Sequence, residues 1–258
     1  MELINTKVGN LEVRAFETRG QMGYSAAEDV EKRLQRIIAK KGEATVVFAA
    51  APSQNELLEA LCKGDVDWSR VRALHMDEYI GLPKDHPAGF GNFLRRAIFD
   101  KLPFKEIHYM ADAGDDAQET CKAYSKIIEK YPPDIILLGV GENGHLAFND
   151  PPVADFNDPE SVKIVELDEV CRNQQVNDGC FASIDDVPKR AITLTMSAII
   201  AVPETVAVVP GRLKAKAVKA MLNGPISTEC PASILRNHPQ STLYLDRESA
   251  SLAFEGKL

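Results

Sequence analysis

A histidine stands among glycines and carboxylates between residues 134 and 152 of this 258-residue chain. The segment opens as a short apolar run, Asp134-Ile-Ile-Leu-Leu, and continues as Gly-Val-Gly-Glu-Asn-Gly-His145-Leu-Ala-Phe-Asn-Asp150. Glycines let backbone N–H groups approach a ligand closely, and an imidazole beside a carboxylate can move a proton near neutral pH. The pattern therefore predicts a proton-transfer pair, His145 and Asp150, just after a buried strand.

The glycines of this segment also match the G-x-G-x-x-G pattern of dinucleotide-binding turns. That pattern should open a long helix, but Pro151 and Pro152 follow soon after Gly144. No second strand ends in an acid about twenty residues further on, as a ribose site requires. A nicotinamide or flavin site is therefore disfavoured. A tight turn that contacts a ligand through Gly141 and Gly144 is the better interpretation.

Further charged residues follow other apolar runs. Asp77 and Glu78 end one such run, and Lys214 comes shortly after another. The two acids could simply cap a turn, and the lysine could simply be solvated. If they lie beside His145, they could instead supply a base and a cation for an anionic substrate. The spacing of these acids and histidines matches no known metal motif, so we expect no metal.

Strands alternating with helices must position these residues. Strands are expected at 11–16, 45–51, 71–76, 107–110, 134–140, 191–195, 205–209 and 241–245, with helices at 25–40, 56–62, 90–100, 115–130, 213–222 and 231–236. This alternation predicts an α/β fold with a mostly parallel sheet covered on both faces. Ligands bind beyond the carboxyl ends of such strands. The polar clusters at 52–55, 77–79, 141–150 and 211–214 should therefore meet at one edge.

Composition and length favour one domain, residues 1–258, with an Asp- and Asn-rich insertion or lid at about 152–190. A net charge of −8 disfavours nucleic acid or an anionic membrane as a partner. The five cysteines include no C-x-x-C pair, which favours reduced thiols in the cytoplasm. No apolar run is long enough to span a membrane, and no export signal is evident.

Three stretches together resemble the glucosamine-6-phosphate deaminase (isomerase) family. They are Met76-Asp-Glu-Tyr-Ile-Gly-Leu-Pro83, Gly139-Val-Gly-Glu-Asn-Gly-His-Leu-Ala-Phe-Asn-Asp-Pro151 and Gly211-Arg-Leu-Lys214. The resemblance implies a modified Rossmann-like, three-layer fold. It also implies conversion of glucosamine 6-phosphate and water to fructose 6-phosphate and ammonia, without a redox cofactor or a metal.

The same resemblance implies roles for individual residues. Asp77 corresponds to the base that moves the C2 proton, and His145 to the histidine that opens the pyranose ring. Asn143 and Asp150 correspond to residues that orient this histidine, and Lys214 to a lysine that contacts the phosphate.

The chain departs from the family pattern in three places. The family usually has a glutamate at the position of Asp150. The aspartate side chain is shorter, so its carboxylate is expected to lie about one methylene further from the histidine. The usual phosphate loop Gly-Gly-Thr-Pro is replaced by Ala51-Pro-Ser53-Gln54. A phosphate-binding arginine of the lid is replaced near Asn177, and Arg172, one helical turn earlier, could substitute for it. These departures affect the anionic end of the substrate more than the proton-transfer residues.

The expected function is therefore that of an amino-sugar-phosphate isomerase and deaminase, with a small phosphosugar as its substrate and with a homo-oligomer left open. Galactosamine 6-phosphate is an alternative substrate. A 6-phosphogluconolactonase and a non-catalytic sugar-phosphate sensor are alternative functions. The candidate catalytic residues are Asp77, Asn143, His145 and Asp150, and the candidate substrate-binding residues are Ser53, Gln54, Glu78, Gly141, Gly144, Arg172 and Lys214.

Overall fold

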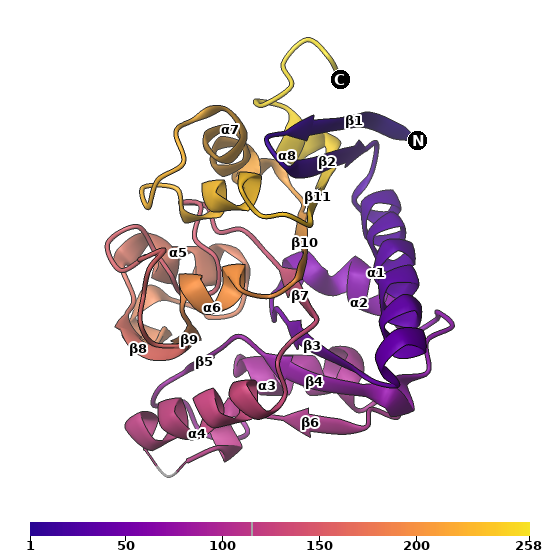
Figure 1. The fold of residues 1–258 in the computed structure, drawn as a ribbon. Helices are drawn as coiled ribbons and strands as arrows, with labels where there is room; N and C mark the ends of the chain where they lie inside the picture. The colour runs from indigo at the N-terminus through magenta and orange to yellow at the C-terminus, as the bar shows by residue number, and fades with distance from the viewer. Residues whose placement is uncertain (115) are drawn as a thin grey trace.

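An eight-stranded sheet forms the centre of the protein in the computed structural model, which describes residues 1–114 and 116–258 (Figure 1). The strand order is β1-β2-β11-β10-β7-β3-β4-β6. Neighbouring strands are parallel, apart from the antiparallel β1–β2 hairpin at one edge. The strands are β1 (Glu2–Val8), β2 (Leu11–Phe16), β3 (Ala44–Phe48), β4 (Val71–His75), β6 (Glu106–His108), β7 (Ile135–Leu138), β10 (Glu204–Val209) and β11 (Ser241–Asp246).

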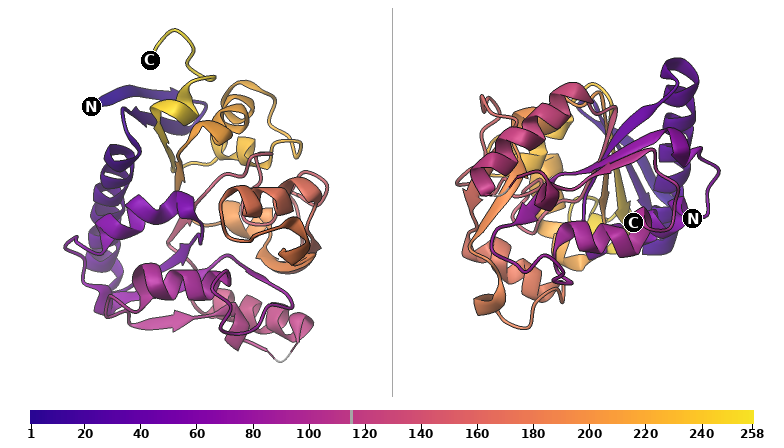
Figure 2. Two further views of the ribbon diagram at one scale, coloured as in Figure 1. Left: turned by 180° about the vertical axis from the view of Figure 1, so that it is seen from behind. Right: turned by 90° about the horizontal axis from the view of Figure 1, so that it is seen from below.

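Helices cover both faces of this sheet, which gives three layers. Figure 2 shows the indigo helix α1 on the opposite side of the strands from the orange C-terminal helices. One core contains side chains of α1, α2 and α3, and the other contains side chains of α4, α6 and α7. The helices are α1 (Arg19–Lys41), α2 (Asn55–Leu61), α3 (Phe90–Leu94), α4 (Ala117–Lys130), α5 (Glu169–Asn177), α6 (Met196–Ile200), α7 (Ala215–Asn223) and α8 (Arg247–Ala250).

Strand β7 shows why its sequence is apolar throughout. Ile135 and Leu137 enter one core, while Ile136 and Leu138 enter the other. Successive side chains of a strand point to opposite faces, so a strand covered on both sides needs apolar residues at every position. The predicted α/β fold with a mostly parallel, doubly covered sheet is confirmed.

A second, three-stranded antiparallel sheet has the order β5-β9-β8. It consists of β5 (Asp77–Tyr79), β9 (Arg190–Leu194) and β8 (Val162–Glu166). The strand expected at 191–195 therefore exists, but it lies outside the main sheet. The segment 77–79, expected only to end the preceding strand, forms a short strand of its own. The segment 152–190 contains both β8 and α5, which its polar composition did not reveal.

Several other boundaries differ from expectation. Helix α1 begins well before residue 25, because the Thr18 side chain accepts a hydrogen bond from the Gln21 N–H and caps its first turn. It ends at Gly42, whose φ of 84° is the left-handed conformation that glycine adopts most easily. The helix expected at 115–130 is α4, and its predicted first residue, 115, lies outside the described residues. Residues 231–236 form a 3₁₀ helix rather than an α-helix. None of the described helices is long and apolar enough to cross a membrane.

Candidate active site

A cavity at the carboxyl ends of the parallel strands brings together residues from four strand-to-helix connections. Ser53 follows β3, Asp77 follows β4, His145 follows β7 and Lys214 follows β10, and all four line this cavity. The prediction that the polar clusters meet at one sheet edge is therefore confirmed. The reason is topological, because parallel strands place all their carboxyl ends on the same side.

Asp77 contributes a buried carboxyl group to the cavity wall. Burial, together with the negative charge of the adjacent Glu78, raises the pKa of Asp77 well above its usual range. No hydrogen bond or ion pair to the Asp77 carboxyl is found among the described residues. A carboxyl group of this kind can exchange a proton with a bound ligand.

His145, Asp150 and Asn143 form a closely connected group beside the cavity. His145 Nδ1 lies 2.8 Å from Asp150 Oδ1, and the Asn143 side-chain amide donates a hydrogen bond of 2.8 Å to the same oxygen. The Asn143 side-chain oxygen Oδ1 in turn accepts a hydrogen bond of 3.1 Å from the His145 backbone N–H. Burial opposes ionisation of Asp150, but the His145 charge and these hydrogen bonds leave its pKa below the usual value. Asp150 is therefore placed to orient and stabilise a protonated imidazole.

The turn between residues 146 and 150 brings this short carboxylate close to the histidine. Ala147 adopts a positive φ of 50°, which is rare for a residue other than glycine. The buried Asn149 side chain holds the turn by donating to the backbone carbonyls of Leu146 and Leu194. The prediction that Asp150 would lie further from the histidine is therefore wrong, because the tight turn compensates for the missing methylene.

Gly141 leaves the room that the imidazole ring occupies. A Cβ atom added at Gly141 would lie 2.2 Å from His145 Cε1, which is far inside van der Waals contact. Gly144 has a different role, since it does not line the cavity and its φ of 86° forms the turn. A Cβ there would meet the sulfur of Cys230 at 2.6 Å. Of the two glycines, only Gly141 is in reach of a ligand.

Replacing Gly141 should therefore displace the histidine. We expect Gly141→Ala to lower kcat roughly 10²-fold, because misplacing a reacting group by about 1 Å has that effect. Steady-state kinetics of the variant would measure this. Gly20→Ala is the control, since nothing lies within 4 Å of a Cβ added at this position in α1. Equal activity of the two variants would contradict the positional role of Gly141.

Lys214 is the cation of the cavity wall. It is buried, and burial lowers its pKa, while the nearby charges of Asp178 and Glu142 act in the opposite direction. Ser53 contributes a hydroxyl group to the same wall. Gln54 lies behind it and does not line the cavity, since its side-chain amide donates to Ser53 Oγ and to backbone carbonyls of β7 and β10.

Two predicted substrate-binding residues point away from the cavity. The Glu78 carboxylate accepts the backbone N–H groups of Tyr79, Phe90 and Gly91, and so fixes the start of α3. Its neighbour Asp77 points the other way because both lie in a strand, where side chains alternate. The Arg172 guanidinium donates to the backbone carbonyls of Ile184 and Val187, so it cannot replace the missing lid arginine.

Helix α5 supplies cavity residues that the sequence did not suggest. Gln174 and Gln175 lie on its inner face, Asp178 follows its last turn, and all three line the cavity. The signal that could have revealed the helix is its N-cap, where the Asp168 carboxylate accepts the Cys171 N–H at 2.6 Å. The polar character of the helix concealed its buried face.

Three potential metal ligands gather where the sequence showed no metal motif. One donor atom each of His145, Asp150 and Cys171 lies within 4.8 Å of the other two. However, His145 Nδ1 and Asp150 Oδ1 are 2.8 Å apart, whereas two ligands of a tetrahedral zinc ion would be roughly 3.3 Å apart. This spacing fits a shared proton better than a metal ion.

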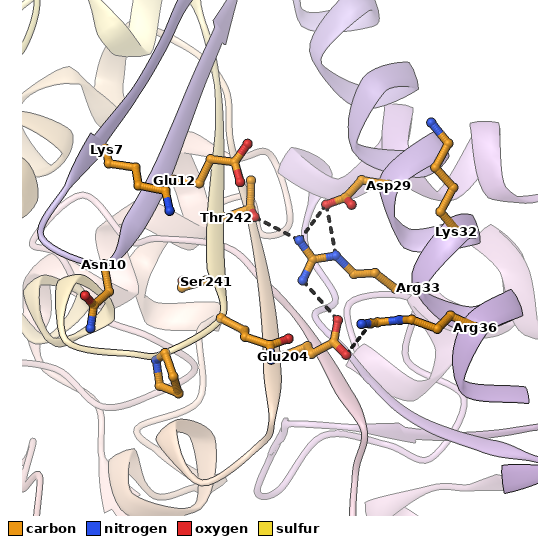
Figure 3. Close-up of a pocket in the computed structure, with 12 residues that line it drawn as sticks. Lys7, Asn10, Glu12, Asp29, Lys32, Arg33, Arg36, Glu204, Ser241 and Thr242 are labelled. Carbon is orange, nitrogen blue, oxygen red and sulfur yellow. Dashed lines mark hydrogen bonds and ion pairs between the residues drawn. The ribbon is translucent and has the colours of Figure 1, made fainter. Parts of the chain in front are cut away.

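A second hollow, of about 430 Å³, lies at the opposite end of the sheet between α1 and the β1–β2 hairpin (Figure 3). Two of its cations are neutralised there. Arg33 bonds to Asp29, Glu204 and Thr242, and Arg36 bonds to Glu204. These contacts tie α1 to β10 and β11. We therefore place the chemistry in the cavity that contains Asp77 and His145.

Comparison with known proteins agrees with this geometry. A family model described as glucosamine-6-phosphate isomerases/6-phosphogluconolactonase matches residues 17–244. The chain is 36% identical over 245 residues to a glucosamine-6-phosphate deaminase of Bacillus cereus strain B4264, an alignment that covers 95% of this chain and 89% of that protein. A glucosamine-6-phosphate deaminase of Bacillus anthracis strain A0248 gives the same values.

Solved structures show the same relationship. A monomeric glucosamine-6-phosphate deaminase superposes with a TM-score of 0.84 at 28% identity, covering 93% of this chain and 99% of that one. A 6-phosphogluconolactonase from Thermotoga maritima shares the fold, with a TM-score of 0.74 at 17% identity and coverage of 92% and 99%. The chain therefore belongs to the glucosamine-6-phosphate isomerase/6-phosphogluconolactonase family.

Proposed function

We propose that this protein is an amino-sugar-phosphate isomerase and deaminase that converts glucosamine 6-phosphate and water to fructose 6-phosphate and ammonia. One observation carries the proposal. A carboxyl group with a raised pKa, Asp77, and a carboxylate-held imidazole, His145, face one cavity. Shifting a proton next to a carbonyl requires a base, and opening a sugar ring requires a separate proton shuttle.

The chemistry divides between these two residues. The substrate is a closed ring, and His145 protonates the ring oxygen as the C1 hydroxyl loses its proton, which gives the open-chain aldehyde. Asp77 then removes the proton at C2, and a proton is returned at C1. The resulting imine at C2 is hydrolysed by water, and ammonia leaves. Asn143 and Asp150 hold the imidazole during this sequence.

The residues of the cavity and the names of the related proteins favour a deaminase over the two alternatives, a lactonase and a sensor. A lactonase cleaves an ester and leaves the C2 proton of its substrate in place, so it would not need a C2 base such as Asp77. A sensor would need neither a base nor a proton shuttle. The proteins compared above that are at least 28% identical to this chain are named glucosamine-6-phosphate deaminases, which supports the same choice.

A substrate panel tests the proposal. We expect ammonia release from glucosamine 6-phosphate, measured with a coupled glutamate dehydrogenase assay, and no hydrolysis of 6-phosphogluconolactone above the spontaneous rate. Galactosamine 6-phosphate reports on the sugar epimer. Lactone hydrolysis without ammonia release would make the protein a lactonase. Ligand-induced thermal stabilisation without any turnover would make it a sensor.

The segment 152–190 is the proposed lid. It carries α5, whose inner face supplies three residues of the cavity wall, so movement of this helix would open and close the site. We also propose a cytoplasmic location. All five cysteines are free thiols, as expected for a protein of a reducing compartment.

Lys214 is the proposed contact of the substrate phosphate. Removing a charged hydrogen-bond donor costs about 1.5–3 kcal/mol, so we expect Lys214→Ala to raise KM roughly 10- to 100-fold with a smaller change in kcat. Lys216→Ala is the matched control, because this exposed neighbour does not line the cavity. Unchanged kinetics of Lys214→Ala would remove the lysine from the site.

A further inference from the structure

Cys171 lies beside the proton shuttle, although no step of the proposed reaction uses it. Its side chain is completely buried on α5, and its backbone N–H is held by the N-cap residue Asp168. Its sulfur, an oxygen of Asp150 and a ring nitrogen of His145 all lie within 4.8 Å of one another. Helix α5 therefore places a thiol within 4.8 Å of the side chains of His145 and Asp150.

The Asp150 carboxylate lacks one hydrogen-bond partner. Its Oδ1 faces both His145 Nδ1 and the Asn143 amide. Its Oδ2 is buried and has no hydrogen-bond partner among the described residues. A buried carboxylate oxygen without a donor is costly, so a donor is expected nearby.

The Cys171 thiol has the properties of that donor. Burial and the negative charge of Asp150 raise the pKa of the thiol far above neutral, so it keeps its proton. Conversely, the interaction with Cys171 is among those that lower the pKa of Asp150. Other charged groups also face the thiol. The charges of Asp168 and Asp77 raise its pKa as well, and Lys214 lies near enough to interact with it electrostatically.

We infer that Cys171 is a positioning residue whose S–H group donates to Asp150, completes the hydrogen bonding of this carboxylate and couples the lid helix to the proton shuttle. The inference rests on the proposed function only in assigning the shuttle to His145. When α5 moves away, Asp150 loses a hydrogen-bond donor, and the strength of its interaction with the His145 imidazole changes. The shuttle is therefore fully assembled only when the lid helix is in place.

Two substitutions separate hydrogen bonding from packing. Cys171→Ala removes the donor, and we expect kcat to fall about tenfold while KM changes less than twofold. The acid limb of the kcat–pH profile should move to higher pH, because a carboxylate with fewer donors binds protons more tightly. Cys171→Ser restores a donor, so kcat and the acid limb should return close to those of the wild type.

Cys180→Ala is the matched control from the same segment, because Cys180 does not line the cavity and does not belong to the group around Asp150. It should leave kcat and the pH profile unchanged. Equal losses in Cys171→Ala and Cys171→Ser, or a Cys171→Ala variant with wild-type kcat and pH profile, would overturn the inference. The melting temperature of each variant identifies a loss that is due to unfolding.

NMR of the His145 imidazole provides a readout that does not require turnover. Its signals can be assigned by comparison with His145→Gln. The ring nitrogen chemical shifts should change in Cys171→Ala and return close to those of the wild type in Cys171→Ser. If the wild type releases no ammonia from any amino-sugar phosphate, the proposed function fails while this measurement still decides the role of Cys171. Unchanged ring nitrogen shifts in Cys171→Ala would reject the coupling.

Discussion

Asp77→Asn is expected to lower kcat by a factor of roughly 10²–10⁴ and to leave ligand binding within about tenfold of the wild type. The amide has nearly the same shape as the carboxyl group but cannot accept the C2 proton. A loss confined to turnover is what a group that acts in the transition state should show. Steady-state ammonia release and calorimetric titration with glucosamine 6-phosphate measure the two quantities.

The same substitution should stabilise the fold at neutral pH. The pKa of Asp77 is raised, so the folded protein binds this proton more tightly than the unfolded chain does. The corresponding stability is fully present below the unfolded pKa, near 4, and is lost as the pH rises through the higher folded pKa. The asparagine side chain carries no charge, so Asp77→Asn should melt at a higher temperature than the wild type at pH 7 and gain nothing at about pH 3.5. For a domain of this size, each kcal/mol raises Tm by about 2–4 °C.

Asp100→Asn is the control for both effects. Asp100 is exposed at the end of the turn after α3 and does not line the cavity, so kcat and Tm should stay unchanged. Two results would contradict the role of Asp77 as a base. One is equal loss of binding and turnover in Asp77→Asn, and the other is full activity. A Tm of Asp77→Asn equal to that of the wild type at pH 7 would contradict the claim that the buried Asp77 charge destabilises the fold.

His145→Gln should also lower kcat roughly 10²–10⁴-fold, since a proton shuttle contributes about this factor. Glutamine can hydrogen bond to Asp150 but cannot carry a proton to the ring oxygen. Because the proposed mechanism uses His145 on the closed ring and Asp77 on the open chain, the two variants should fail at different steps. In the reverse direction, from fructose 6-phosphate and ammonia, the base removes a proton from C1 of the C2 imine. Exchange of this C1 proton with deuterated water, followed by NMR, should be undetectable in Asp77→Asn. It should be slow in His145→Gln.

His108→Gln provides the matched control for this second prediction. His108 lies on β6, pairs with Glu106 and is not part of the cavity wall. Its replacement should change kcat less than twofold. Retention of more than a tenth of the wild-type kcat in His145→Gln would show that ring opening does not depend on this imidazole.

Much of the site could be predicted from local sequence alone. Residues 135–138 are apolar at every position because β7 is covered on both faces, and that pattern is visible without a structure. Strand ends then locate the polar residues that follow. Because the strands are parallel, their carboxyl ends lie at one edge of the sheet. This edge must therefore carry Ser53, Asp77, His145 and Lys214.

Only the tertiary structure decided which of the neighbouring polar side chains face the cavity. Asp77 faces it and Glu78 does not, because 77–79 is a strand of a second sheet whose partners lie more than 80 residues away in the sequence. Arg172 points away from the cavity, whereas Gln175 lines it. Helix α5 is only weakly amphipathic, so its packing against the rest of the protein, and not its sequence pattern, determines which face is buried.

The distance between His145 and Asp150 shows the same division. The sequence identified the pair, and the family resemblance identified the carboxylate as shorter than usual. The tight turn through Ala147 brings the two side chains to 2.8 Å. The thiol of Cys171 lies within 4.8 Å of an oxygen of this carboxylate, although it belongs to a helix about twenty residues further along the chain. Local periodicity determines which segments are buried, but contacts between distant segments determine how each side chain is oriented and what it touches.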